Sequence, residues 1–373
     1  MSAKILLISP YHGGSHRAWA TGYQQYSQHQ VQLLTLPARF WKWRMHGGAV
    51  TLARQYLAEN PRPDLILATD MLNVTTFLAL TRPGVPLHLY MHENQLTYPL
   101  PANSHSGPMR RQKGERDLHY AFINYASMLA ADHVHFNSAY HRHTFLAELP
   151  RFLRHFPEYN ELDTVAELAA RSSVLPVGLD LARLAPPATP VPPAGAPLIL
   201  WNQRWEYDKN PAGFFHALYT IAAEGIPFRL ALCGENFRRH PTEFNTALTR
   251  LRDQICHVGY ANEADYRHLL HEAAITISTA HHEFFGISIL EAIACHTFPI
   301  LPHRLSYPEL VPPPFHHRCL YENQGGLLQR LRWALANPAG AATIATQLAQ
   351  TVTRFDWATL APVYDTTLIQ MAG

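Results

Sequence analysis

Short apolar runs alternate along this chain with longer, more polar stretches that have the spacing of amphipathic helices. In the first half, the predicted strands are residues 4–9, 31–36, 64–69, 87–91 and 133–137, and the predicted helices are residues 15–29, 49–59 and 118–131. Strands that alternate with helices form a parallel sheet with helices on both faces. The alternation therefore predicts an α/β domain with a doubly wound parallel sheet.

The same rhythm returns in the second half, with predicted strands at residues 198–201, 228–233, 275–278 and 298–301 and predicted helices at residues 211–224 and 263–272. Between the halves, residues 185–197 are rich in proline, which removes amide donors and fixes φ. We predict Rossmann-like domains at residues 1–185 and 198–355, a linker at 186–197, and a C-terminal helix at 356–373 that crosses back to the first domain. The length of 373 residues suits two domains.

The composition predicts a soluble protein. Hydrophobic residues make up 47% of the chain and charged residues 16%, which excludes wholesale disorder. No apolar run reaches the about 20 residues that a bilayer crossing needs, because Asp70 interrupts the most apolar stretch. The apolar segment near the start is too short for a secretory signal. We expect a cytoplasmic protein without membrane contact.

Cysteine spacing and net charge exclude further classes. Cys233, Cys256, Cys295 and Cys319 are widely separated and form no C-x-x-C pair, so neither a zinc site nor a disulfide framework is indicated. A net charge of +2 argues against nonspecific polyanion binding. Any contact with nucleic acid must therefore be local.

The loop after the first predicted strand contains Gly13 and Gly14. Ligands of open α/β sheets bind beyond the carboxyl ends of strands. Adjacent glycines permit close backbone approach, and the next helix begins there with free N–H groups that suit an anion. The alternative is a tight turn with no ligand.

Two cations follow the first strand of the second half, in the segment that contains Arg204 and Lys209. Their spacing allows them to straddle a diphosphate. The alternative is a pair of solvated cations beside a turn.

Residues 281–291 follow another predicted strand and open a helix. Glu283 can accept hydrogen bonds from sugar hydroxyls, and the backbone N–H groups of Phe285, Gly286 and Ile287 suit a phosphate. Glu291 lies within the first helical turns, where it can reach a ribose diol. The alternative is that both acids only stabilise the helix dipole.

The order of these motifs resembles that of retaining GT-B glycosyltransferases, with residues 177–180 before the linker also fitting the pattern. Residues 11–16, 36–44, 91–99 and 136–138 resemble the tRNA-queuosine mannosyltransferases more closely. The resemblance implies two Rossmann-like domains facing a central cleft. It also implies transfer of mannose from GDP-mannose to queuosine at the anticodon wobble position of tRNA-Asp. The identity of the acceptor rests on the resemblance alone.

The resemblance assigns catalytic roles to His92, Glu283, Arg204 and Lys209, with His92 near the anomeric centre; the alternative for His92 is a capping role. The leaving phosphate itself takes the acceptor proton, and the cations stabilise the diphosphate without a metal. We expect no cofactor and no metal site. The residues expected to bind the donor are Gly13, Gly14, Arg204, Lys209, Gly234, Val258, Glu283, Phe285, Gly286, Ile287 and Glu291.

Basic and aromatic residues mark the expected tRNA surface, since cations bind phosphates and indoles stack on an everted base. The residues expected to bind the acceptor are His12, His16, Arg39, Trp41, Lys42, Trp43, Arg44, Glu93, Asn94, Arg110, Arg111, Lys113 and Arg116. The alternative is a buried Trp41/Trp43 pair with a solvated charge run.

Two other functions remain open. The chain can act on a lipid, glycan or small-molecule acceptor, or it can be a catalytically inactive RNA-binding relative. No protein partner is predicted.

Overall fold

The computed structural model describes residues 2–99, 117–186, 195–234 and 242–371. The chain divides into two compact units, one formed by Met1–Leu179 with Phe355–Gly373 and the other by Asp180–Arg354. Each contains a six-stranded sheet whose paired strands are all parallel. The predicted α/β fold with two doubly wound sheets is confirmed.

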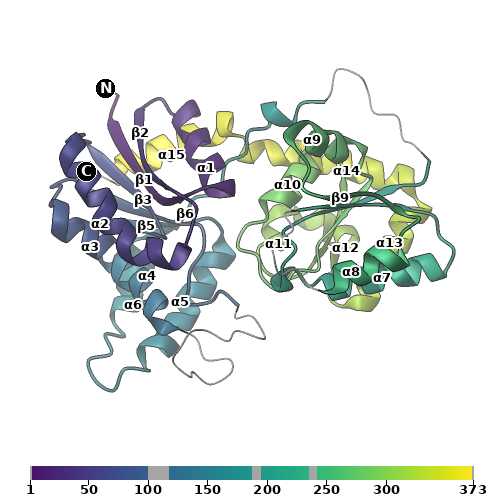
Figure 1. Ribbon diagram of the computed structural model, residues 1–373, viewed down its shortest axis with the longest axis horizontal. Helices are drawn as coiled ribbons and strands as arrows, with labels where there is room; N and C mark the ends of the chain where they lie inside the picture. Colours follow the sequence, from purple (N-terminus) through teal and green to yellow (C-terminus); the bar gives the residue numbers. More distant parts are fainter. Residues whose placement is uncertain (1, 100–116, 187–194, 235–241, 372–373) are drawn as a thin grey trace. The chain divides into compact units, whose positions relative to one another are not determined.

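The strands of unit 1 lie in the order β2-β1-β3-β4-β5-β6. Helices α2, α3 and α4 lie along one side of this sheet, and α1 and α15 along the other (Figure 1). The elements are β1 (Lys4–His12), α1 (Gly14–Tyr26), β2 (Gln30–Pro37), α2 (Trp41–Glu59), β3 (Leu65–Thr69), α3 (Val74–Thr81), β4 (Leu87–Met91), α4 (Leu118–Ala130), β5 (His133–Phe136), α5 (Ala139–Leu153), α6 (Thr164–Ala170), β6 (Ser172–Val174) and α15 (Trp357–Gln370).

The strands of unit 2 lie in the order β12-β11-β10-β7-β8-β9. The elements are β7 (Leu198–Asn202), α7 (Pro211–Ala223), β8 (Arg229–Cys233), α8 (Thr242–Arg250), β9 (Ile255–Gly259), α9 (Glu263–Glu272), β10 (Ile275–Ile277), α10 (Ile287–Ala294), β11 (Phe298–Pro302), α11 (Tyr307–Leu310), α12 (His316–Cys319), β12 (Leu320–Tyr321), α13 (Gln324–Ala336) and α14 (Pro338–Val352), with short 3₁₀ turns that include η1 (Ala182–Leu184) and η2 (Tyr207–Lys209).

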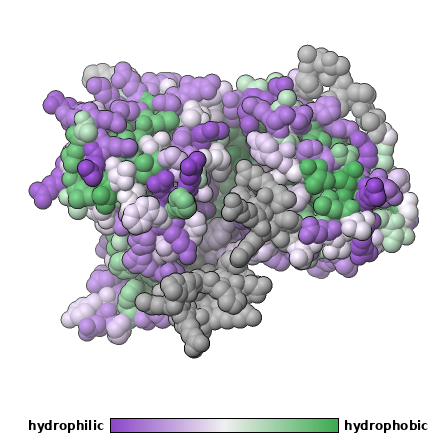
Figure 2. All heavy atoms as spheres, viewed as in Figure 1, coloured by the Kyte–Doolittle hydropathy of each residue, from purple (hydrophilic) through white to green (hydrophobic). Residues whose placement is uncertain are grey.

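The central strands read as continuous apolar runs because helices cover both faces of each sheet. Every residue of β3, β4, β7 and β11 is buried. On the face drawn in Figure 2, hydrophilic residues dominate the surface of both units, and apolar residues gather in a few separate patches. Within the described residues, no helix combines the length and the apolar character needed to span a membrane.

Helix α2 begins earlier than the sequence analysis predicts, at Trp41 instead of residue 49. Phe40 precedes it in the left-handed conformation, with φ of 52° and ψ of 57°. The buried residues Met45, Gly48, Ala49 and Leu52 continue one apolar face backward toward the new start. Residues 41–44 are therefore the first helical turn and not part of a loop.

The C-terminal helix α15 belongs to unit 1 and packs beside α1 (Figure 1). The Trp357 indole lies directly against Gly22 and Gly178, where any side chain would overlap the ring. The Asp365 carboxylate accepts hydrogen bonds from the Tyr23 hydroxyl at 2.8 Å and the Ser27 hydroxyl at 2.6 Å. Packing and charge-assisted hydrogen bonds together fix this helix.

Two buried histidines, His88 in β4 and His135 in β5, lie next to each other. His88 Nδ1 and His135 Nε2 are 3.1 Å apart, and His135 Nδ1 lies 2.9 Å from the Ser173 hydroxyl. Burial, with a smaller contribution from His133, lowers the pKa of His88 from 6.5 to about 4. Both buried rings are held neutral because a charge there would be desolvated.

This histidine pair predicts acid sensitivity. Because the pKa of His88 is lower in the folded chain than its unfolded value of 6.5, the unfolded state binds more protons as pH falls toward 4. We expect the free energy of unfolding to fall by about 3 kcal/mol from this group between pH 7 and pH 4. Urea unfolding measured across this range checks the expectation.

The matched variants are His88→Gln and His143→Gln, the second at an exposed position of α5. His88→Gln is expected to flatten the pH dependence, and His143→Gln to leave it unchanged. Equal pH dependence in wild type and His88→Gln would contradict the assignment.

Candidate active site

A buried lysine joins two loops at the carboxyl edge of the sheet in unit 2. Lys209 ends η2, which follows β7, and Glu283 lies in the loop after β10, the strand that pairs with β7. Lys209 Nζ lies 3.2 Å from Glu283 Oε2 and 3.2 Å from Asp208 Oδ2, and it donates to the His282 carbonyl at 2.8 Å. The structure thus brings together Lys209 and Glu283, both of which the sequence analysis expects to bind the donor, and adds Asp208.

The charges in this group compensate one another away from water. Lys209 is 6% exposed and Asp208 1%. Burial alone would lower the pKa of Lys209, but the carboxylates of Glu283 and Asp208 outweigh it, so the pKa is raised. Lys209 therefore remains an ammonium ion, with Glu283 at its more exposed side. Such a fixed cation can stabilise a leaving diphosphate.

Arg204 extends the same charged group toward the surface. Its guanidinium forms a 3.2 Å ion pair with Glu206, and half of its side chain is exposed. The Arg204 charge acts electrostatically on Lys209 and on His282. Burial, followed by the Lys209 charge, lowers the pKa of His282 to about 4. Two cations thus lie near one acid-lined loop.

Glu291 belongs to a second polar group, in the middle of α10. Its carboxylate accepts hydrogen bonds from Arg183 at 2.6 Å and from the Tyr266 hydroxyl at 2.8 Å. Asn202, at the end of β7, donates to the Tyr266 hydroxyl at 3.2 Å. Burial raises the pKa of Glu291. The sequence analysis did not identify Arg183 and Tyr266 as site residues. The position of Arg183, shortly after the motif at residues 177–180, is a signal that could have identified it.

The turn into α10 requires glycine. Gly286 precedes the helix with φ of 102°, and a Cβ there would lie 3.1 Å from Leu310 Cδ1. Phe285 is buried, and its N–H donates to Glu283 Oε1 at 3.4 Å. Ile287 begins the helix. The turn therefore fixes Glu283 and the first amides of α10 in one rigid segment.

Two of the residues expected to bind the donor lie at other strand ends of unit 2. Gly234 follows β8 with φ of 149°, and a Cβ there would lie 2.7 Å from the Gln203 carbonyl oxygen. Val258 lies in the edge strand β9 and is 43% exposed. The close approach of Gly234 to the loop after β7 explains why a glycine is needed there.

In unit 1, Gly13 and Gly14 connect β1 to α1. Gly13 packs so closely on Ala38 that a Cβ would overlap it, and Gly14 has φ of 51° with open space around its Cα. His12 ends β1, and burial together with the Arg17 charge lowers its pKa. Packing against Ala38 therefore explains why residue 13 is a glycine. A Cβ at Gly14 would meet no neighbouring atom within 4 Å.

His92 follows β4 and gathers with His16 and Asp70. These three side chains have ligand atoms within 4.8 Å of one another, and among the described residues they are the one group of His, Cys, Asp and Glu with metal-ligand spacing. The neighbouring Asn94 is buried, and its amide contacts Thr97 at 3.0 Å and His141 Nε2 at 2.9 Å. Glu93 accepts a hydrogen bond from Gln95 at 3.0 Å.

The basic and aromatic segment 39–44 is divided between the surface and the interior. Phe40 is 80% exposed and Trp43 64%. Trp41 is half-buried against Tyr120, and the Lys42 ammonium lies 5.6 Å from the Trp41 ring centroid. The Arg44 guanidinium donates to the Pro37 carbonyl at 3.1 Å, and Arg39 precedes the helix. The alternative of a buried tryptophan pair is wrong for Trp43.

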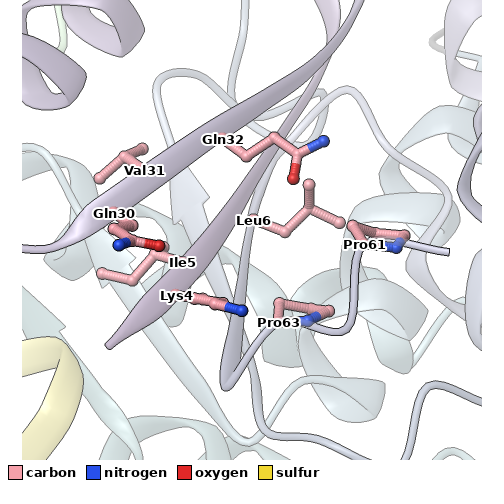
Figure 3. Close-up of a pocket in the computed structure, with 8 residues that line it drawn as sticks. All are labelled: Lys4, Ile5, Leu6, Gln30, Val31, Gln32, Pro61 and Pro63. Carbon is pink, nitrogen blue, oxygen red and sulfur yellow. The ribbon is translucent and has the colours of Figure 1, made fainter. Parts of the chain in front are cut away.

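The second predicted basic stretch, Arg110, Arg111, Lys113 and Arg116, lies outside the described residues. A surface hollow of 320 Å³ lies elsewhere in unit 1 (Figure 3). Lys4 and Gln30, which line it, begin β1 and β2, so it opens at the amino ends of these strands. Ligands of parallel sheets bind at the opposite ends.

Comparison with known proteins shows the family. The family model described as tRNA-queuosine alpha-mannosyltransferase N-terminal matches residues 4–179, and the model of glycosyl transferases group 1 matches residues 188–348. A tRNA-queuosine alpha-mannosyltransferase from Drosophila melanogaster is 30% identical over 338 residues, which cover 88% of this chain and 85% of that protein.

Solved structures share the fold at low identity. Sucrose-phosphate synthase from Thermosynechococcus elongatus superposes with a TM-score of 0.73 at 17% identity, covering 99% of each chain. The catalytic domain of starch synthase IV from Arabidopsis thaliana gives a TM-score of 0.73 at 11% identity, covering 100% of each chain. Fold and family models define the protein as a GT-B glycosyltransferase. The chain belongs to the tRNA-queuosine alpha-mannosyltransferase family.

The buried ion group predicts a stability difference between the two cations. Lys209→Met leaves Asp208 and Glu283 without their cation, and we expect the free energy of unfolding to fall by about 3–5 kcal/mol. Arg204→Met removes an exposed pair, and we expect a change within about 1 kcal/mol. Urea unfolding of both variants at pH 7 measures the contrast. Similar stability of the two variants would show that Lys209 does not compensate the buried acids.

Proposed function

We propose that this glycosyltransferase transfers mannose, with retention of configuration, from GDP-mannose to queuosine at the wobble position of tRNA-Asp. The donor half of the proposal is supported by the buried Lys209 ammonium, with Glu283 and Arg204 beside it. The acceptor half is supported by the 30% identical relative, whose name states its tRNA-queuosine substrate. We infer a cytoplasmic location from the proposed tRNA acceptor.

The proposed chemistry requires charge stabilisation more than a protein base. The bond between the sugar C1 and the diphosphate oxygen breaks, and a bond from C1 to the acceptor oxygen forms on the same face. The proton of the acceptor hydroxyl passes to the leaving phosphate oxygen. Arg204 and Lys209 stabilise the charge that develops on the diphosphate, so the step needs no metal ion.

The remaining residues complete the proposed sites. The amides of the turn from Phe285 to Ile287 bind phosphate, Glu283 binds sugar hydroxyls and Glu291 binds the ribose diol. Gly234 and Val258 approach the base, and the glycine turn after β1 approaches the donor. His92 contacts the transferred sugar. The acceptor tRNA is bound by His12, His16, Arg39, Trp41, Lys42, Trp43, Arg44, Glu93, Asn94, Arg110, Arg111, Lys113 and Arg116.

A transfer assay tests the proposal. The protein is incubated with GDP-mannose and queuosine-containing tRNA-Asp, and the nucleosides are analysed by mass spectrometry. We expect the queuosine nucleoside to gain one hexose, and the same tRNA with guanosine at the wobble position to gain none. Hexose transfer to another acceptor in the absence of tRNA would redirect the assignment, and tight tRNA binding without any donor use would indicate an inactive binder.

The variant Arg204→Gln tests whether Arg204 belongs to the donor site. We expect kcat/KM for the donor to fall by about 100- to 1,000-fold, because one charge that stabilises the leaving diphosphate is removed. Arg332→Gln is the matched control, since Arg332 is a half-exposed arginine of the same unit that pairs with Glu224. Equal activity of the two variants would place Arg204 outside the donor site.

The exposed aromatic residue Trp43 gives a separate prediction for the acceptor. Its ring packs on the helix at Gly47, and 64% of the residue is exposed. Base stacking contributes about 1–3 kcal/mol per base, so Trp43→Ala is expected to raise KM for tRNA by about 5- to 100-fold. Tyr159→Ala, at an 85% exposed aromatic residue of the same unit, is the control. Unchanged KM in Trp43→Ala would remove α2 from the tRNA surface.

A further inference from the structure

The imidazole of His92 is enclosed by other aromatic rings. His16 stacks on it with ring centroids 4.3 Å apart, Trp19 meets it edge-on at 4.6 Å, and Tyr90 at 4.7 Å. The His92 side chain is 8% exposed. The ring cannot swing to another position without disturbing the core, so its orientation is set by packing.

The carboxyl group of Asp70, directly after β3, faces His92. Asp70 is 2% exposed, and its Oδ1 accepts the backbone N–H of His92 at 3.0 Å and lies 3.5 Å from His92 Nδ1. Asn124 donates to the Asp70 carbonyl at 3.0 Å, and Asn137 donates to the His92 carbonyl at 2.9 Å. The backbones of both residues are thereby pinned, which holds the carboxylate beside Nδ1.

The ring needs a partner that determines where its proton lies. Burial lowers the pKa of His92 to about 3, so the imidazole is neutral at physiological pH. Among the described residues, neither ring nitrogen has a hydrogen-bond partner. A neutral imidazole carries its proton on Nδ1 or on Nε2, and a carboxylate beside Nδ1 favours Nδ1. Nε2 then presents a buried lone pair, which requires a hydrogen-bond donor.

We propose that Asp70 is a positioning residue that holds His92 in the Nδ1–H tautomer, so that Nε2 accepts a hydrogen bond from a hydroxyl group of the transferred sugar. This inference rests on the proposed function. The 3.5 Å separation is longer than a hydrogen bond, as catalytic contacts often are in enzymes without bound substrate. The other titratable groups that face the ring are His16 on α1 and Tyr90 on β4.

The test compares two aspartates at opposite ends of one strand. Asp70→Asn replaces the carboxylate by an amide that can also donate to Nδ1, which removes the preference for Nδ1–H. Asp64→Asn is the control, because Asp64 precedes β3 and accepts the exposed backbone N–H of Lys4 at 2.8 Å. The tautomer is measured by NMR on protein with ¹⁵N-labelled histidine, with His92→Gln used to assign the signal, and kcat is measured in the transfer assay.

We expect the Nδ1–H form of His92 in wild type and Asp64→Asn, and its loss in Asp70→Asn. We also expect kcat to fall by about 10- to 100-fold in Asp70→Asn, with KM for tRNA unchanged, as for other groups that orient a functional histidine. An Nε2–H form in wild type would overturn the proposal, and this measurement needs no variant to fold. A kcat loss with an unchanged tautomer would also overturn it.

Titration of wild type with Zn²⁺ separates a metal site from a positioning residue. A stoichiometric complex at micromolar Zn²⁺ that broadens or shifts both His16 and His92 and supports activity would overturn the proposal in favour of metal binding. The tautomer is observed on the protein without substrates. An enzyme that transfers no hexose would therefore refute the proposed function while the NMR result still decides the role of Asp70 toward the ring.

Discussion

The candidate site depends on one constraint: all strands of each sheet point the same way. In a parallel sheet the loops that follow the strands emerge at a common edge, and the strands themselves are buried too deeply to carry ligands. Lys209 and Glu283 are 74 positions apart in the sequence, yet they form an ion pair because β7 and β10 are neighbours. The same constraint joins Asp70 and His92 through the neighbouring strands β3 and β4.

The two units stabilise their buried titratable side chains in different ways. In unit 2, Lys209 stays charged because Asp208 and Glu283 surround it, and the ion group supplies a fixed positive charge. In unit 1, burial among aromatic rings keeps His92 neutral beside Asp70. A charged group suits a leaving diphosphate, whereas a neutral imidazole with a directed lone pair suits a hydroxyl. The charge state of Lys209 and of His92 thus follows from the side chains that surround each of them.

Several residues singled out as functional also have plain structural reasons. Gly13 is needed where Ala38 packs against the turn, and Gly234 where the backbone of Gln203 passes. The amide of Asn94 is engaged by Thr97 of its own loop and by His141 of α5. Trp19, which packs edge-on against the His92 ring, donates to the Tyr364 hydroxyl of α15 at 3.0 Å. The C-terminal helix therefore supports the packing around this histidine.

The sequence by itself determined the α/β class and most strands, because apolar periodicity is a local property. It missed α3, α5, α6 and β6 in unit 1 and α8, β9, α11, α12, β12, α13 and α14 in unit 2, in part because short apolar helices and strands have similar patterns. It also began α2 too late, because the helix start depends on the left-handed Phe40. Only the tertiary structure placed Lys209 beside Glu283, Arg183 and Tyr266 on Glu291, and Asp70 beside His92. The physical reason is that burial and partners across strands, which no single segment encodes, decide where a charge or a proton lies.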